Sequence, residues 1–163
     1  MFDIIKSLFI PKNCITAVVD GELMPLTSVK DEVFSKKLMG DGVAIKPSKG
    51  LVVSPVFGTV TMLFPTKHSF GITMENGIQI LIHIGLDTVN LNGRGFNKLV
   101  DVGTKVKIGT PIIKFDELLL KNNEYDMTTM MIFTSCDDFN LDFNNQGKAI
   151  KGKTIVAKYK RKE

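Results

Sequence analysis

The sequence is short of the residues on which several common functions depend. Its 163 residues include only two histidines and two cysteines, and its 21 basic residues are lysines apart from Arg94 and Arg161. Arginine is the side chain best suited to bidentate contacts with bases and phosphates. Although the net charge is +4, the scarcity of arginine and the scatter of the lysines argue against nucleic-acid binding. We expect the basic residues 158–162 to form a solvated end.

Long apolar runs and secretion signals are absent as well. No stretch approaches the ~20 apolar residues of a membrane-spanning helix. The N-terminus carries Asp3 and has neither a basic region nor a small-residue cleavage site. Cys14 and Cys136 lack metal-ligand spacing, so we expect both to be reduced and structural. These features predict a cytoplasmic protein, which we expect to be a monomer.

The composition is that of one globular domain. Hydrophobic residues make up 44% of the chain and charged residues 23%, which is ordinary for a protein with a real core. Residues 13–163 are predicted to form this domain and residues 1–12 a tail. Residues 2–10 of the tail are amphipathic, with three apolar side chains on one side: Phe2, Ile5 and Phe9. Nine residues are too few for a stable helix in water, so a frayed tail and a weak membrane-surface contact both remain open.

The two histidines flank an Asn-Gly pair at residues 76–77 that predicts a β-hairpin. Asn-Gly between alternating apolar runs is typical of a two-residue type I′ turn. Centring the turn on this pair places Phe70 opposite His83 and Gly85 opposite His68. The histidines are then diagonal neighbours on one face, about 7–8 Å apart at Cα. The same register puts Thr66, Phe70, Ile72 and Leu81 around them, and four isoleucines, Ile78, Ile80, Ile82 and Ile84, in the core.

Paired imidazoles suit metal ligation, acid–base catalysis and nucleophilic phosphoryl transfer. A single histidine on an apolar strand is more often a hydrogen-bonded core residue. Here both histidines of the chain fall on one face, which favours a shared site.

Short strands separated by Gly or Asn turns predict an all-β fold. A weak internal repeat supports it: residues 18–26 resemble 55–63, with Gly21 over Gly58, and residues 106–113 resemble 149–156, with Gly109 over Gly152. Two copies of such a unit facing each other make an antiparallel β-sandwich or a distorted barrel.

One or two short helical turns are also expected. Ser28 and Asp31 have the spacing of a capping box, so a short helix is predicted to begin there and to end before Gly40. A second turn is expected near residues 115–120. The Asn-rich residues 140–146 are predicted to form a loop.

Three segments resemble the glucose-type enzyme IIA of the bacterial phosphoenolpyruvate-dependent sugar phosphotransferase system. Residues 83–96 resemble its active-site segment, residues 65–72 its second histidine segment, and residues 31–47 its helical turn and glycine-flanked aspartate. The resemblance covers roughly residues 14–160. It implies a β-sandwich built from a duplicated hybrid motif, in agreement with the internal repeat.

The resemblance also implies a function. In this family a phosphoryl group arrives from the phosphocarrier protein HPr, sits on a histidine, and passes to a cysteine in the IIB domain of a sugar permease. By position, His83 is the phosphorylated residue and His68 stabilises the phosphoryl group. Thr66 orients His68, and the carbonyl of Gly85 fixes the tautomer of His83.

An apolar rim around the pair is expected to exclude water and to receive partner proteins. Its members are Val33, Phe34, Leu38, Met39, Phe64, Phe70, Leu81 and Val89, with Asp31 and Asp87 at its edge to pair with basic residues of a partner. No cofactor is required for this chemistry. A zinc ion held by His68 and His83 stays open, with a further carboxylate supplied by a partner.

Other functions fit less well. A zinc hydrolase of a related duplicated fold needs a third protein ligand at metal-binding spacing, which the sequence lacks. A biotinyl or lipoyl carrier needs a lysine at a hairpin tip, and residues 127–131 have none. A regulatory or metal-binding protein of the same fold, without phosphoryl transfer, remains the alternative.

Overall fold

A computed structural model describes residues 10–163 of the chain. The predicted domain over residues 13–163 lies inside this range. All but the last residue of the amphipathic segment 2–10 lies outside the described residues. Within the described range, no helix is long and apolar enough to cross a bilayer.

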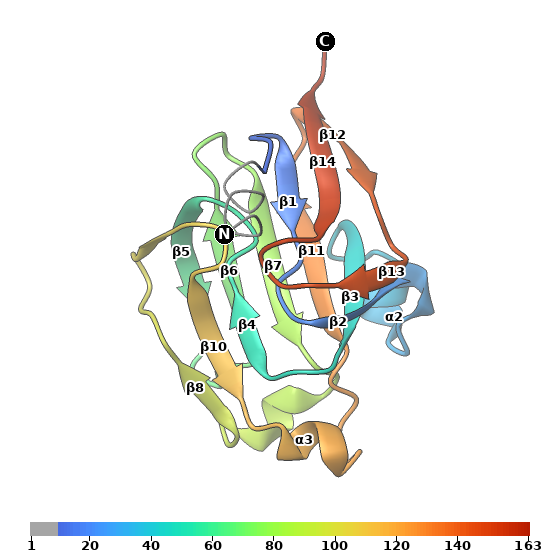
Figure 1. Cartoon of the computed structure of the whole chain (residues 1–163), viewed down its shortest axis with the longest axis vertical. Coiled ribbons are helices and arrows are strands. Elements are labelled where there is room, and N and C mark those ends of the chain that lie inside the picture. Colours follow the sequence, from blue (N-terminus) through green and yellow to red (C-terminus); the bar gives the residue numbers. More distant parts are fainter. Residues whose placement is uncertain (1–9) are drawn as a thin grey trace, which may run out of the picture.

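The largest sheet has eight strands in the order β13-β2-β3-β11-β7-β6-β5-β9 (Figure 1). Every neighbouring pair in it is antiparallel. In chain order its strands are β2 (Gly21–Pro25), β3 (Asp41–Pro47), β5 (Gly58–Leu63), β6 (Ser69–Thr73), β7 (Gln79–Ile84), β9 (Lys105–Val106), β11 (Thr129–Ser135) and β13 (Gly147–Ala149).

Two three-stranded sheets pack on one face of the large sheet and complete a β-sandwich. One has the order β1-β14-β12, with β1 (Cys14–Thr16), β12 (Phe139–Phe143) and β14 (Ile155–Arg161). The other has the order β4-β10-β8, with β4 (Leu51–Val53), β8 (Phe96–Lys98) and β10 (Pro111–Phe115). None of the sheets formed by residues 10–163 closes on itself, so the predicted all-β sandwich is confirmed and the distorted barrel is not formed there.

The loop predicted at residues 140–146 is wrong over most of its length, because β12 occupies residues 139–143. Leu141 and Phe143 are partly buried against the main core, and the intervening residues face outward. This alternation holds the segment in a strand despite its asparagines, because burial of one face outweighs local turn preference.

The main core lies between the large sheet and the two small ones. Ile78, Ile80, Ile82 and Ile84 are at most 1% exposed, as the alternation of the sequence predicts. Phe70 and Ile72 face the same core, with Phe70 fully buried. The prediction that these two side chains lie on the same face of the sheet as the histidines is therefore wrong.

The error comes from the hairpin loop. Ile72 pairs with Ile80 and Ser69 with His83, one residue out of the predicted register. The loop has three residues between Met74 and Ile78, whose backbones pair, and Gly77 takes a left-handed φ of +93°. The amide of Ile78 also donates to the side-chain oxygen of Asn76. A three-residue loop of this kind shifts the register by one residue and so exchanges the two faces of β6.

A second, smaller cluster lies on the outer face of the large sheet, beneath short helical turns. It joins Phe34 of α2 (Glu32–Ser35) and Leu26 of η1 (Leu26–Ser28) to Leu81 and Met130 of the sheet. The capping role predicted for Ser28 is wrong: Val29 is extended, and the Asp31 carboxylate accepts from the amide of Val33 instead. Two more turns are η2 (Thr88–Leu91) and α3 (Leu118–Lys121), of which only α3 was expected.

The two ends of the large sheet contain corresponding pairs of strands. β13 pairs with β2 as β9 pairs with β5, with Ala149 opposite Gly21 and Val106 opposite Gly58. A Cβ at Gly21 would lie 2.0 Å from the carbonyl oxygen of Lys46, and one at Gly58 would lie 2.7 Å from that of Thr73. Both strands therefore begin where a neighbouring backbone leaves room only for glycine. This correspondence matches the internal repeat and a duplicated motif.

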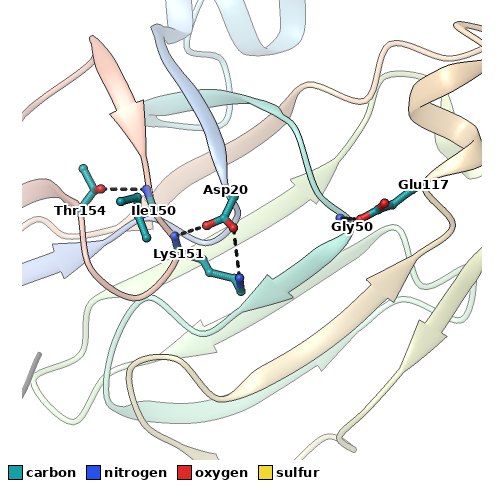
Figure 2. A network of polar contacts seen from close by, with 6 residues as sticks. All are labelled: Asp20, Gly50, Glu117, Ile150, Lys151 and Thr154. Carbon is teal, nitrogen blue, oxygen red and sulfur yellow. Dashed lines mark hydrogen bonds and ion pairs between the residues drawn. The ribbon is translucent and has the colours of Figure 1, made fainter. Parts of the chain in front are cut away.

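In the repeat that contains Gly21, an ion pair and a hydrogen bond connect the turns that precede β2 and β14. Asp20 accepts from the backbone amide of Lys151 at 2.9 Å and pairs with its ammonium group at 3.2 Å, as Figure 2 shows. Burial opposes ionisation of Asp20, but the bonds and charge of Lys151 outweigh it, so the pKa of this carboxyl is lowered. The contact between Asp20 and Lys151 therefore holds these two turns together without a core residue.

Candidate functional site: a histidine pair on the outer face of the large sheet

His83 lies near the end of β7, on the face opposite the main core. Its Nδ1 lies 2.9 Å from the carbonyl oxygen of Gly85. A carbonyl only accepts, so Nδ1 carries the proton and Nε2 keeps a free lone pair. Gly85 has a φ of +80°, and a Cβ there would meet the Thr88 side chain at 2.4 Å. Glycine is thus required at the residue whose carbonyl sets the tautomer.

His68 reaches the same face by a different route. Its carbonyl accepts from the amide of Ile84, so strand alternation alone would send its side chain toward the core. It lies just before β6, however, and follows Lys67, whose φ is +59° in a tight turn. Its Nδ1 lies 2.7 Å from the hydroxyl of Thr66, and the residue is only 6% exposed.

The two imidazole rings meet edge to face. Their centroids are 5.0 Å apart and their planes are inclined by 76°. Each ring also packs on a phenylalanine: His83 on Phe34 at 4.9 Å and His68 on Phe64 at 5.4 Å. The predicted closeness of the histidines is confirmed, although the turn at Lys67, and not the ladder register, produces it.

The pair borders a hollow of about 600 Å³ with largely apolar walls. Of the expected rim, six residues line it: Asp31, Val33, Phe34, Met39, Phe64 and Leu81. Leu38 and Val89 are exposed but do not line the hollow, and Asp87 is exposed next to η2. Phe70 cannot belong to the rim, because its side chain is fully buried in the main core.

Several lining residues were missed by sequence reasoning. They include Ser69, Gly71 and Gln79, together with Thr61, Met62 and Thr134. Ser69 and Gly71 share the face of His83 because they stand opposite His83 and Leu81. The signal that locates them is the hairpin register, which a three-residue loop at residues 75–77 would have given.

Burial lowers the pKa of both imidazoles. For His83 the loss of solvation acts first and the neighbouring His68 second, and together they bring the pKa to about 4. The carbonyl of Gly85 and the carboxylates of Asp31 and Asp87 oppose this shift. The pKa of His68 is lowered by burial. At neutral pH both rings are therefore neutral, and His83 offers a lone pair and not a positive charge.

This shift predicts a pH dependence of stability. Because the unfolded histidine titrates near pH 6.5 and the folded His83 near 4, the unfolded state binds the extra proton between these values. Stability is full above pH 6.5 and falls as the pH drops to about 4, by on the order of 3 kcal/mol. Nitrogen-detected NMR should give a His83 midpoint near 4, and denaturant titrations of His83→Asn should lack this part of the slope. A His83 titration midpoint at or above pH 6.5 would contradict the expected lowering of its pKa by burial.

The comparisons with known proteins agree with this geometry. The family model for EIIA 1 of the phosphoenolpyruvate-dependent sugar phosphotransferase system matches residues 13–139. This chain belongs to that family. It is also similar to the solved structure of glucose permease IIA from Mycoplasma capricolum, with a TM-score of 0.81 and 35% identity over 88% of this chain and 93% of that one.

Membership of the EIIA family establishes the general role. The chain is a phosphocarrier component of the sugar phosphotransferase system, and it interacts with HPr and with a IIB domain. The comparisons give no support to the regulatory or metal-binding alternative without phosphoryl transfer. Across residues 10–163, no three His, Cys, Asp or Glu side chains are grouped so as to hold a metal ion.

Proposed function

We propose that His83 is the residue of this EIIA chain that accepts the phosphoryl group, and that the sugar served is of the glucose type. The observation that carries the proposal is the pairing of the His83 Nδ1 with the carbonyl of Gly85. It leaves Nε2 as the nucleophile, beside a second imidazole and at the edge of an open apolar hollow. The sugar class rests on the similarity to the Mycoplasma glucose permease IIA.

In the first transfer, the Nε2 lone pair of His83 attacks the phosphorus of phospho-HPr. A new N–P bond forms as the bond from phosphorus to the HPr histidine breaks, and that histidine keeps the electron pair. In the second transfer, the thiolate of a IIB cysteine attacks the same phosphorus. The N–P bond to His83 breaks, and its electron pair returns to Nε2.

His68 is placed to stabilise the phosphoryl oxygens. When its Nδ1 accepts a hydrogen bond from Thr66, the proton of the neutral ring sits on Nε2 and can be donated to a phosphoryl oxygen. Phosphorylation of His83 would also bring negative charge within reach of the His68 ring. This charge raises the pKa of His68 and favours its protonated form. Thr66 acts here as a positioning residue.

The hollow is suited to docking of both partners. Phe64 and Val33 are 41% and 42% exposed, and Asp31 lies at the same border. A convex apolar surface of HPr or of a IIB domain would cover these residues, exclude water and slow hydrolysis of the phosphohistidine. Asp31 and Asp87 would face basic residues of the partner. We expect the protein to act as a monomer in the cytoplasm.

The direct test is to find where the phosphoryl group goes. The chain is incubated with labelled phosphoenolpyruvate, enzyme I and HPr, and is then digested under alkaline conditions that preserve phosphohistidine. Label on the peptide containing His83 supports the proposal. Label on the peptide containing His68 would assign the roles the other way round.

A zinc ion shared by the two histidines is a further proposal. The edge-to-face rings lie close enough for both to approach one ion after small rotamer changes, with Zn–N bonds of ~2.0–2.1 Å. The remaining ligands must come from a partner carboxylate and water. Calorimetry should show zinc binding by the wild type that weakens when His68→Ala removes one ligand. Equal affinity in the two proteins would show that the pair does not bind zinc.

A further inference from the structure

The peptide unit that joins Gly85 to Leu86 is held from both sides. Its carbonyl, on Gly85, accepts from the His83 Nδ1 at 2.9 Å, and its N–H, on Leu86, donates to the backbone carbonyl of Asp126 at 2.7 Å. Because a peptide unit is planar and trans, its N–H and its carbonyl point in opposite directions. The bond to Asp126 therefore sets the direction in which the Gly85 carbonyl meets the imidazole.

A second bond joins the same two segments. The amide of Gly85 donates to the carbonyl of Thr128 at 3.0 Å, one residue before β11 begins. In a regular strand successive amides point to opposite sides, so two consecutive donors reach one neighbouring segment only where the backbone turns. Gly85 supplies that turn with its φ of +80°. Residues 126–128 thus hold the turn from which the Gly85 carbonyl reaches His83.

The shape of residues 126–128 depends on the side chain of Asp126. Its carboxylate accepts from the amide of Thr128 at 3.0 Å and from the hydroxyl of Thr128 at 2.6 Å. A bond from an aspartate side chain to the amide two residues on is an Asx turn, which fixes a short segment outside regular secondary structure. The two backbone carbonyls that hold the Gly85 turn belong to the first and last residues of this Asx turn.

The Asp126 carboxylate stands apart from the reacting groups. Asp126 is exposed and does not line the hollow at the histidine pair. The carboxylates that raise the pKa of His83 are those of Asp31 and Asp87. What Asp126 contributes to His83 is therefore geometric, and it passes through the two backbone hydrogen bonds to Gly85 and Leu86.

We propose that Asp126 is a positioning residue for the phosphoryl transfer at His83. Its Asx turn holds the peptide between Gly85 and Leu86, the Gly85 carbonyl holds the proton on Nδ1, and Nε2 is left free to attack phosphorus. In the other tautomer Nε2 carries the proton and has no lone pair to offer. The effect on transfer rests on the proposed function of His83, whereas the tautomer is a property of the unphosphorylated protein.

The first measurement is the tautomer of His83 at neutral pH, where both imidazoles are neutral. Long-range nitrogen–proton NMR separates a ring nitrogen that carries a proton from one with a free lone pair, and His68→Gln assigns the signals to the two histidines. The wild type should show the His83 proton on Nδ1 alone. In Asp126→Ala the His83 signals should shift toward an average of the two tautomers, because the Gly85 carbonyl is no longer held toward the ring.

The second measurement is the single-turnover rate of phosphoryl acceptance from phospho-HPr. For Asp126→Ala the rate at saturating phospho-HPr should fall on the order of 10-fold, the lower end of the loss when a metal-binding histidine loses its outer hydrogen-bond partner. The phospho-HPr concentration that gives half of this rate should not change, because Asp126 lies outside the hollow at the histidine pair. Asp126→Asn keeps an oxygen that accepts from Thr128 and should restore both the tautomer and the rate.

Asp116→Ala is the matched control. The Asp116 carboxylate makes the same kind of turn, since it accepts from the amide of Leu118 at 2.9 Å, and Asp116 is also exposed. Its turn lies at the start of α3, and its backbone bonds go to Gly95 and Leu119. Asp116→Ala should therefore leave the His83 tautomer and the transfer rate unchanged.

Thr128→Val is a milder change that decides the matter if circular dichroism shows that Asp126→Ala does not fold. It removes only the hydroxyl bond to the Asp126 carboxylate and keeps the bond from the backbone amide. A shift of the His83 signals in the same direction as in Asp126→Ala, but smaller, supports the proposal. No shift in Thr128→Val would contradict it.

Three other results would overturn the proposal. An unchanged tautomer in folded Asp126→Ala would show that the Gly85 carbonyl is held without this turn. Equal changes in Asp116→Ala would show a general loosening of the fold, and an Asp126→Asn variant as impaired as Asp126→Ala would show that the charge acts and not the turn. If wild-type His83 takes no label, the proposed function fails, and the NMR comparison of the unphosphorylated proteins still decides whether Asp126 positions the Gly85 carbonyl.

Discussion

His83→Ala is expected to accept no label from phospho-HPr while remaining folded. The substitution removes the imidazole whose Nε2 is left with a free lone pair because its Nδ1 donates to the Gly85 carbonyl. His68 is not expected to substitute, because it is 6% exposed and its Nδ1 is bonded to Thr66. The expected loss is complete, below detection in a gel assay with labelled phosphoenolpyruvate, enzyme I and HPr.

The control for this experiment is a variant that keeps the shape of the site. His83→Gln fills more of the space against Phe34 than alanine does, so it guards against a collapse of the small outer cluster. Circular dichroism and thermal melting should show that both variants are folded. Recovery of label on either folded variant would show that another residue carries the phosphoryl group.

His68→Gln is expected to separate the two transfers. Receipt from phospho-HPr can draw on the cationic groups of the partner, whereas donation to a IIB cysteine brings a second anion to the site. A protonated His68 offsets that charge. Glutamine keeps hydrogen-bonding reach but carries no charge. The variant should therefore still be phosphorylated on His83, yet transfer to IIB should slow on the order of 10²–10³-fold, the usual effect of losing one stabilising donor.

Rapid-quench measurement of each half-reaction separately decides the matter. Thr66→Val is the informative companion, because it leaves the His68 imidazole in place and removes only its hydroxyl partner. A positioning role predicts a smaller loss in the same second step. Equal impairment of both steps in His68→Gln, or impairment of receipt alone, would show that His68 does not act in this way.

The fold and the site differ in how far the sequence predicts them. The alternation of isoleucines along β7 fixes which of its faces is buried, because period-2 burial leaves one arrangement for a strand packed on one side. The duplicated glycines mark strands that begin against a neighbouring backbone. Both signals are local, and both are confirmed.

The register of the β6–β7 hairpin was harder to predict. Asn76 and Gly77 fit both a two-residue and a three-residue loop, and the choice depends on whether Phe70 can be buried against the main core. That condition involves the small sheets, whose strands lie outside the hairpin in the sequence. A local rule therefore exchanged the faces of β6 and put Phe70 in the rim in place of Ser69 and Gly71.

By itself the sequence determined that this is an all-β protein with an internal duplication and that its two histidines form one site. These properties follow from periodicity, from glycines at close approaches and from the rarity of histidine. Only the tertiary structure decided how His68 reaches His83, through the left-handed turn at Lys67, and which strand residues stand beside the pair. It also decided that His83 is neutral at physiological pH, because the pKa depends on burial by side chains brought from α2, β6 and β11.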